Sequence, residues 1–573
     1  MTRPRALFLL AALLVGCATP AGPRGSDSGD RTATAVAPKR ITAAITGDPH
    51  TLYNKLNTNS AIRGIDAVEK LVTVGMGVED NTGAIRPALA DAIPSLENGG
   101  WQVFPDGAME TTWRLREGGR WHDGTPFTAD DLLFTVQISR DRDLPVFGHI
   151  GFGSLDEVLA VDARTIRVRW NKPYIEADRL FSSGFALPLP KHLLQPTYVE
   201  AKESLTDLPH WTLAFIGNGP FKLKEWVSGS HLVLDAFEGY ALGRPKLDQI
   251  EVRFILDSNT LIANVLAEQI HLTLGRGISV EQALQVRNQW RSGNVDVGPP
   301  RSALNTWPQL LNPTPAVVAD VRYRKALFHG IDRQAMVDNL NGGLTQVVHS
   351  WLRTSEPEYP QLERNIVRYE YDPRKAVQGI EAIGFTRGGD GIFRDGDGQR
   401  LSMEVRTITG DVNQKSLLAV ADYWQKVGVS VDPVVVPSQR QADLPYRSNF
   451  PAFDILRGNT NIENFNNLHS SGARLPENGY RGGSGGTNYT RYVSPQLDAL
   501  IEHFFATIPR KDRMEVAGEL VHFMTDQVLV MGLFYDLSPA FVDKRLRNVT
   551  PMGGDAFLPW NAHEWDLAPT NAG

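Results

Sequence analysis

The chain has 573 residues, 42% of them hydrophobic, which is enough to build several cores and excludes a wholly disordered protein. Its 58 basic and 65 acidic residues give a formal net charge of −7, which argues against nucleic acid as a partner. The single cysteine, Cys17, excludes an intramolecular disulfide and a cysteine-built zinc or iron–sulfur site.

Residues 1–17 have the pattern of an export signal. Arg3 and Arg5 precede the uncharged run ALFLLAALLV. This run is shorter than the roughly 20 apolar residues that span a bilayer. Leu14-Val15-Gly16-Cys17 resembles a bacterial lipobox, in which the cysteine becomes the lipid-carrying N-terminus. We therefore predict lipidation at Cys17, and an ordinary signal peptide with a chance cysteine is the alternative.

Residues 18–39 are predicted to be a flexible linker, because small residues, proline and polar residues dominate them. Acyl chains on Cys17 would hold the protein to a membrane without a spanning helix. We expect the body from Arg40 onward to lie outside the cytoplasm, at the surface of a bacterial membrane.

Three helices have clear predicted starts within the body. Thr128-Ala129-Asp130-Asp131 resembles a capping box, with Asp in place of the usual Glu. Asp372-Pro373 begins a second helix, which Gly384 is expected to end. Ser494-Pro495 begins a third, with apolar residues at helical spacing as far as Ile508.

Alternating apolar and charged residues predict strands at residues 113–116, 166–170 and 250–254. Residues 390–398 are expected to be turn residues of a hairpin, and residues 457–467 a polar loop. Strands and helices alternate throughout, which indicates an α/β or α+β protein.

The stretch LREGGRWHDGTPFTADDLLFT, Leu115 to Thr135, resembles the signature of family 5 extracellular solute-binding proteins, the peptide/nickel-binding receptors of ABC importers. Four further segments resemble motifs of that family in the same order. They are GNGPFKL from Gly217, DVRYRKAL with IDR from Asp320, YDPRKA from Tyr371, and NYTRY with LDALI from Asn488. These similarities extend over residues 41–548.

The resemblance implies an α/β architecture of two lobes, the class II periplasmic-binding-protein-like fold, with a hinge between them. Lobe 1 would comprise residues 40–70, 214–302 and 531–573. An extra subdomain of lobe 1 would occupy residues 71–213, and lobe 2 residues 303–530. Closure of the lobes around a ligand would be a hinge motion.

The resemblance also implies a function: a monomeric, lipid-anchored receptor that captures a small solute and delivers it to an ABC permease and its ATPase. A peptide is the leading ligand class, and a sugar-like molecule or metal chelate is the alternative. A sensory or scaffold binding protein remains a further alternative. We expect no enzymatic activity, no cofactor and no metal site, because no nucleophile elbow, metal-ligand motif or complete calcium loop is present.

Candidate ligand contacts are the polar and aromatic residues where strands are expected to end at a cleft. They are Tyr53, Asn54, Trp307, Arg406, Thr409, Asn459, Asn461 and Glu463. For Tyr53 and Trp307 the alternative is core packing, and for the asparagines it is turn formation.

One departure from the family bears on the ligand. Peptide-binding members carry an Asp in the last of these loops, which pairs with the ligand's amino terminus. Here the loop reads RGNTNIENFNN, and Glu463 is its only carboxylate. The Arg and Tyr of many peptide binders are replaced by Thr407 and Thr409, beside Arg406. Glu463 and Arg406 are therefore the predicted clamps for a peptide's ends.

Overall fold

The computed structural model describes residues 37–57, 62–81, 84–275, 277–297, 300, 302–354, 356–441, 443–480, 482, 487–550 and 558–568. The body, Lys39–Gly573, forms one compact unit. Cys17 and most of the predicted linker lie outside the described residues. None of the helices in the described ranges is both long and apolar enough to cross a membrane.

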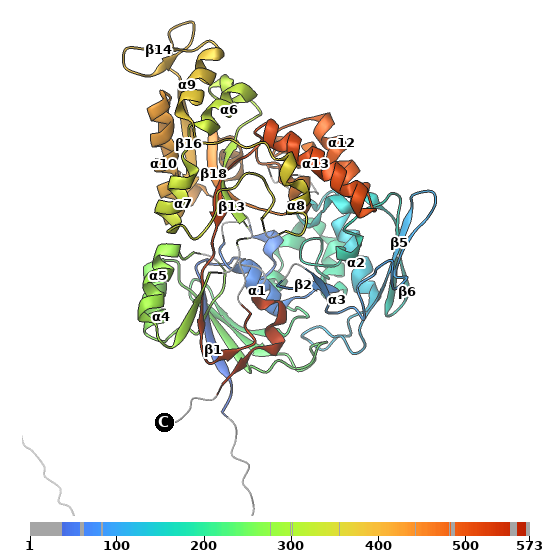
Figure 1. Cartoon of the computed structure of the whole chain (residues 1–573). Helices are drawn as coiled ribbons and strands as arrows, with labels where there is room; N and C mark the ends of the chain where they lie inside the picture. Colours follow the sequence, from blue (N-terminus) through green and yellow to red (C-terminus); the bar gives the residue numbers. More distant parts are fainter. Residues whose placement is uncertain are drawn as a thin grey trace, which may run out of the picture. The chain divides into compact units, whose positions relative to one another are not determined.

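A seven-stranded mixed sheet forms the lower part of the body in Figure 1. Helices α4 (Ser258–Leu266) and α5 (Val280–Gln289) pack on one of its faces, and α1 (Ile65–Val72) packs on the other. In order, the strands are β12 (Gly293–Asp296), β20 (Ala540–Asp543), β11 (Leu272–Thr273), β1 (Arg40–Ile45), β10 (Gln249–Phe254), β9 (His231–Ala236) and β8 (Phe221–Val227).

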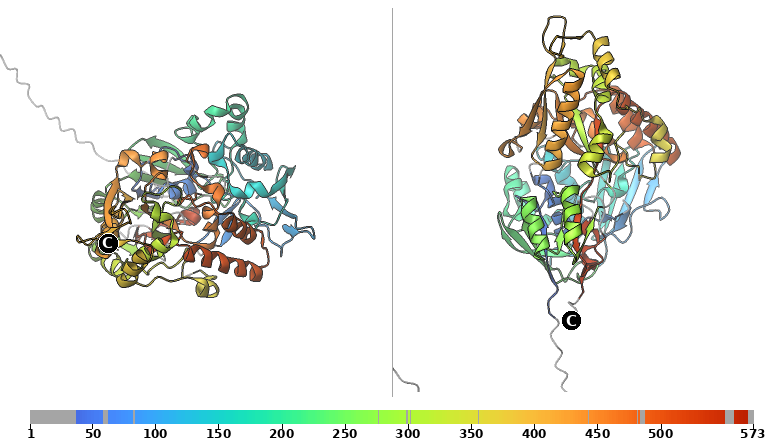
Figure 2. Two further views of the ribbon diagram at one scale, coloured as in Figure 1. Left: turned by 90° about the horizontal axis from the view of Figure 1, so that it is seen from above. Right: turned by 60° about the vertical axis from the view of Figure 1, so that its left-hand side comes forward.

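A five-stranded sheet forms the upper part (Figure 1). In order, its strands are β17 (Ser430–Val436), β16 (Ser402–Ile408), β18 (Phe453–Asn459), β13 (Ser302–Pro308) and β19 (Met531–Asp536). The surrounding helices are α6 (Val321–His329), α7 (Arg333–Asn341), α8 (Tyr359–Leu362), α9 (Pro373–Ala382), α10 (Asp411–Val427), α11 (Leu444–Ser448), α12 (Pro495–Ala506) and α13 (Arg510–Asp526). In the right-hand view of Figure 2, α10 and the green pair α4 and α5 lie on the same side of the molecule.

The chain crosses between the two sheets twice, from β12 to β13 and from β19 to β20. The predicted return to lobe 1 at residue 531 coincides with the start of β19. Because β19 pairs with β13 in the upper sheet, the chain changes sheets only after Asp536. Two helix-flanked sheets joined by two crossings match the predicted two-lobed α/β class.

A smaller four-stranded antiparallel sheet lies within the predicted subdomain. Helices α2 (Ala129–Ser139) and α3 (Lys191–Glu200) accompany it. Its strands are β4 (Trp101–Val103), β5 (Met109–Arg114), β7 (Thr165–Trp170) and β6 (Leu155–Asp162). The two-stranded ladders are β2 (Gly77–Glu79) with β3 (Ile85–Pro87), β14 (Thr386–Arg387) with β15 (Phe393–Arg394), and β21 (Leu546–Arg547) with β22 (Asp566–Leu567).

The predicted helix starts are confirmed. Thr128 and Asp131 form the expected capping box, in which the Asp131 carboxylate accepts the Thr128 backbone N–H at 2.9 Å. The Asp372 side chain caps α9, and Gly384 follows that helix with φ of 98°. Ser494 caps α12, which ends at Ala506, before Ile508.

One local prediction was wrong, and a second was right only in part. The segment 457–467 is not one loop, because β18 continues to Asn459 and residues 462–468 form a 3-10 helix. Ile462, Phe465 and Leu468 recur every three residues, the period of such a helix, and all three are buried. The segment 390–398 lies in a hairpin as predicted, because β14 pairs with β15, but Phe393 and Arg394 are strand and not turn.

The signature stretch and the GNGPFKL motif meet at a buried histidine. His122 Nδ1 accepts the Gly217 N–H at 3.2 Å, and His122 Nε2 lies 3.1 Å from the Gly219 carbonyl oxygen. Both bonds need the neutral ring with its proton on Nε2. The Asn218 side chain accepts the Val74 N–H at 2.8 Å. Two motifs far apart in sequence thus anchor the chain that leaves α1.

We expect Gly217→Ala to lower the free energy of unfolding by about 2–3 kcal/mol. A Cβ atom at Gly217 would lie 2.0 Å from the Val72 carbonyl oxygen, so the backbone must shift. Gly396→Ala is the matched control, because nothing lies within 4 Å of its Cβ position. Denaturant unfolding of both variants measures the difference. Equal stability of the two would contradict this account of the motif.

Candidate functional site

The two sheets face each other through loops at strand ends. The Arg63 guanidinium, from the segment before α1, donates to the Thr409 carbonyl oxygen at 3.1 Å. Thr409 follows β16, and its hydroxyl accepts from the Gln441 side-chain amide at 2.9 Å. Lys415 of α10 pairs with Glu281 of α5 at 3.2 Å. Of the predicted contacts, Thr409 is therefore placed at the junction of the two sheets.

Arg406 is already engaged within the upper sheet. Its guanidinium contacts the Glu404 carboxylate, donates to the Tyr446 carbonyl oxygen at 3.3 Å and stacks on the Tyr446 ring at 4.4 Å. Only 8% of the residue is exposed. Its charge is therefore balanced inside the protein, so pairing with a ligand would require the contact with Glu404 to change.

Tyr53 and Asn54 lie in the segment between β1 and α1. Tyr53 is buried, with its ring centroid 5.3 Å from that of Trp211 and 5.7 Å from that of Phe147. The Asn54 backbone N–H donates to the Glu69 carboxylate at 2.7 Å. The contacts of Tyr53 are those of core packing, the alternative that the sequence left open.

Trp307 lies within β13, near the end of the strand. Its indole N–H donates to the Leu456 carbonyl oxygen at 3.1 Å. Its ring lies 5.8 Å from Trp351 and 5.9 Å from Tyr489. Trp307 therefore belongs to an aromatic group on one face of the five-stranded sheet, and the structure does not bring it next to Tyr53.

The segment 459–463 supplies the last predicted contacts. Asn461 caps the 3-10 helix, because its side chain accepts the Asn464 N–H at 3.1 Å. This is the turn-forming role that the sequence left open for the asparagines. Asn459 ends β18, and Glu463 lies in the 3-10 helix. The side chains of Asn459 and Glu463 lie outside the described part, so their roles stay predictions.

A buried ionic cluster that the sequence did not predict lies on the same face as Trp307. Asp454, the second residue of β18, is fully buried, and the Arg447 guanidinium pairs with its Oδ2 at 2.9 Å. The Tyr489 hydroxyl donates to the same oxygen at 2.6 Å. Burial, together with the Asp454 charge, raises the pKa of Tyr489. A lone acidic residue inside the apolar strand FDIL was the signal for this cluster.

A second buried polar group surrounds Lys55, near Tyr53. The Lys55 ammonium donates to the Phe185 carbonyl oxygen at 2.7 Å. Burial lowers the pKa of Lys55 to about 8 and raises the pKa of Glu69 to about 7. Burial also lowers the pKa of His149 to about 3. Such pKa shifts arise both at functional sites and in structural cores. Here Lys55, Glu69 and His149 form their hydrogen bonds with main-chain groups, as structural residues do.

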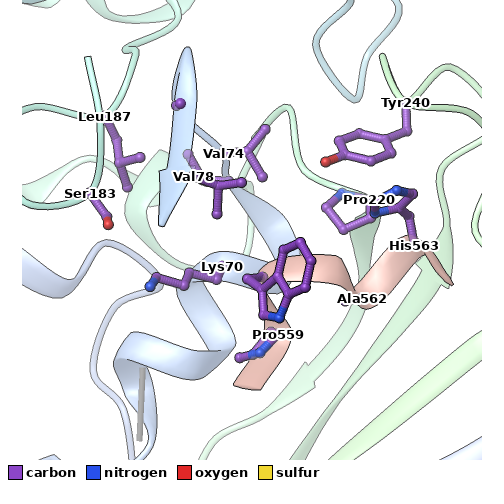
Figure 3. Close-up of a pocket in the computed structure, with 14 residues that line it drawn as sticks. Lys70, Val74, Val78, Ser183, Leu187, Pro220, Tyr240, Pro559, Ala562 and His563 are labelled. Carbon is purple, nitrogen blue, oxygen red and sulfur yellow. The ribbon is translucent and has the colours of Figure 1, made fainter. Parts of the chain in front are cut away.

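A small cavity of about 10 Å³ lies beneath the C-terminal segment (Figure 3). Residues of α1, of the subdomain and of the segment 559–563 line it. Two of the buried polar atoms on its lining residues, Thr73 Oγ1 and His563 Nδ1, have no hydrogen-bond partner. A cavity of this size with polar walls suits a single water molecule and is too small for a peptide.

No group of three His, Cys, Asp or Glu side chains within the described ranges is arranged to hold a metal ion. The residues that lie together around the two sheets, such as Arg63, Arg447 and Tyr489, are cationic, aromatic and hydrogen-bonding groups. Their chemistry is that of recognition by charge pairing and apolar contact.

Comparison with known proteins identifies the family. The sequence model of "Bacterial extracellular solute-binding proteins, family 5 Middle" matches residues 85–473. The chain is 24% identical to the oligopeptide-binding protein AppA of Bacillus subtilis over 557 residues, covering 93% of this chain and 94% of AppA.

Solved structures share the fold. AppA from Bacillus subtilis, in complex with a nonapeptide, superposes with a TM-score of 0.77 at 20% identity, covering 93% of this chain and 100% of AppA. NikZ from Campylobacter jejuni, in complex with Ni(L-His), gives a TM-score of 0.77 at 21% identity, covering 92% and 99%. The predicted two-lobed α/β fold is thereby confirmed. The chain belongs to the family 5 bacterial extracellular solute-binding proteins.

Proposed function

We propose that this protein is the receptor of an ABC importer, which encloses a small solute between its two lobes and passes it to the permease and ATPase. The observation that carries the proposal is the family match over residues 85–473, together with two sheets joined by two crossings. Two crossings allow a hinge, and a ligand that contacts both lobes only in the closed state shifts the balance toward closure.

The proposed ligand is a peptide, and a metal chelate is the second candidate. AppA was solved with a nonapeptide and NikZ with Ni(L-His). Both ligands carry carboxylates, and the junction between the sheets contains Arg63 and the loop at Thr409. The eight residues predicted as ligand contacts from the sequence, of which Tyr53 is the first and Glu463 the last, are also our proposed ligand contacts. Arg406 would have to exchange Glu404 for the ligand.

We propose lobe boundaries close to the predicted ones, with the second crossing between Asp536 and Ala540. We also propose that Cys17 carries the lipid that holds the receptor outside the cytoplasm, and that the protein acts as a monomer without enzymatic activity. A sensory or scaffold role would use the same binding event without a permease.

The test combines two measurements on the purified protein. Mass spectrometry of the solute released on denaturation is expected to identify a peptide or a chelate. Small-angle scattering with that solute restored is expected to show a smaller radius of gyration than the emptied protein, because the lobes close. Binding of the solute without a decrease in the radius of gyration would contradict the closure mechanism. The control is the emptied protein mixed with an unrelated solute.

A further inference from the structure

The ionic cluster on the five-stranded sheet holds more positive than negative charge. Arg447 and Asp454 balance each other, as do Arg406 and Glu404. Arg474 adds a further guanidinium to this group. It packs over the Tyr489 ring at 4.8 Å, and among the described residues no carboxylate or carbonyl accepts a hydrogen bond from it.

Several donors in this cluster are buried without an acceptor. Arg474 Nε is one, and Arg447 Nη1 is another, in a side chain that is only 7% exposed. The indole N–H of Trp351, beside Trp307, is a third. Buried donors that lack an acceptor are costly, and an unpaired buried cation is more so. The cluster also contains an unpartnered buried carboxylate oxygen, Asp454 Oδ1, but the three donors outnumber it and favour a ligand with oxygen acceptors.

The cluster faces the subdomain. Trp307, Asp454 and Arg406 are direct cross-strand partners on β13, β18 and β16, so their side chains share one face. The opposite face packs against α6 and α10. Trp307 and Tyr489 belong to the same continuous apolar cluster as the subdomain residues Trp113 and Phe181. This face of lobe 2 is therefore connected to the subdomain of lobe 1 through packed apolar side chains, which include those of α12 and α13.

Asp454 uses one of its two carboxylate oxygens in this network. Its Oδ2 is shared by Arg447 and Tyr489, whereas its buried Oδ1 has no hydrogen-bond partner among the described residues. Arg474 stacks on the Tyr489 ring, and within the described part of the chain its buried Nε has no acceptor. A planar guanidinium offers two parallel N–H bonds, the geometry that a carboxylate accepts.

We propose that Arg474 is an anion subsite of the solute-binding cleft, which receives a carboxylate of the captured solute. This inference rests on the proposed function. Tyr489 positions the guanidinium, and the Arg447–Asp454 pair holds Tyr489 in place. Trp307 and Trp351 supply apolar walls beside the carboxylate, which strengthen the pairing by excluding water.

The test compares matched acid and amide probes by calorimetric titration. The first pair is a library of Ala-Xaa-Ala tripeptides with a free C-terminal carboxylate and the same library as C-terminal amides. The second pair is the Ni(II) complexes of L-histidine and L-histidinamide. The wild-type protein is expected to bind the acid of at least one pair roughly 10- to 100-fold more tightly than its amide.

Three variants test whether Arg474 causes the preference for the acid over the amide. Arg474→Gln is expected to lose the preference for the acid, and Arg474→Lys to keep part of it, since the charge remains. Arg491→Gln is the matched control, because Arg491 is another buried arginine of this region, with its Nη1 already bound to Ser448 and Asn449. It is expected to retain the preference. Thermal melts check that each variant is folded.

Two results would overturn the subsite. One is equal binding of acids and amides by the wild type, and the other is an unchanged preference in Arg474→Gln. Either leaves the receptor function standing. Failure of the wild type to bind any of the four probes would overturn the proposed ligand classes, and the subsite with them.

Discussion

Replacing Asp454 with alanine is expected to lower the free energy of unfolding by about 3–5 kcal/mol. The carboxylate is fully buried, and its loss leaves the Arg447 guanidinium without its counter-charge in a dry environment. It also removes the acceptor of the Tyr489 hydroxyl. Thermal and denaturant unfolding measure the change.

A double-mutant cycle separates the ion pair from simple loss of packing. Asp454→Leu combined with Arg447→Met is expected to be less destabilised than the sum of the single variants, because no charge is left unpaired. The control is Asp422→Ala, which breaks the exposed pair with Lys426 on α10. That change is expected to cost no more than about 0.5 kcal/mol. A similarly small loss at Asp454 would show that the buried pair contributes little.

Acidification is expected to destabilise the protein on the order of 8 kcal/mol between pH 6.5 and pH 4. Burial lowers the pKa of His122, His210 and His349 to about 4 and that of His149 to about 3. The unfolded chain takes up these protons near pH 6.5, whereas the folded protein takes them up only near pH 4 or below. Stability is therefore lost as the pH falls, by roughly 3 kcal/mol for each histidine. Glu69, whose pKa burial raises to about 7, acts in the opposite direction.

His122→Asn tests the part of that dependence that belongs to one histidine. The Asn side chain has an acceptor for the Gly217 N–H but takes up no proton. The variant is expected to lose about 3 kcal/mol less than the wild type over the same pH interval. His503→Asn, on the exposed side of α12, is the control and is expected to follow the wild-type curve. Parallel curves for wild type and His122→Asn would refute the role of His122.

Local structure could be read from the sequence because short-range chemistry decides it. The capping box at Thr128, the Asp372 cap and the Ser494 cap each depend on side chains within three residues of the helix start. The 3-10 helix at 462–468 was missed because its apolar residues recur every three positions within a run rich in asparagine, and asparagine favours turns.

The candidate site was harder to predict, because its contacts connect distant residues. Nothing local in the sequence indicates that Arg447, Asp454 and Tyr489 meet, or that Glu404 occupies Arg406. The family motifs themselves are largely scaffold. Arg333 of the IDR motif, for example, donates to the carbonyl oxygens of Val348 and Tyr369 at 2.7 and 2.5 Å. Motif positions therefore identified the family, whereas ligand contacts require the folded chain.

Strand β20 lies between β11 and β12, although it is made long after both of them. The seven-stranded sheet therefore has a gap in its interior until residues 540–543 of β20 are available to fill it. The five-stranded sheet likewise awaits β19 at its edge, but its other strands are already adjacent to one another. During biogenesis the upper lobe can therefore assemble most of its sheet first, and the lower lobe can close only as the chain terminates.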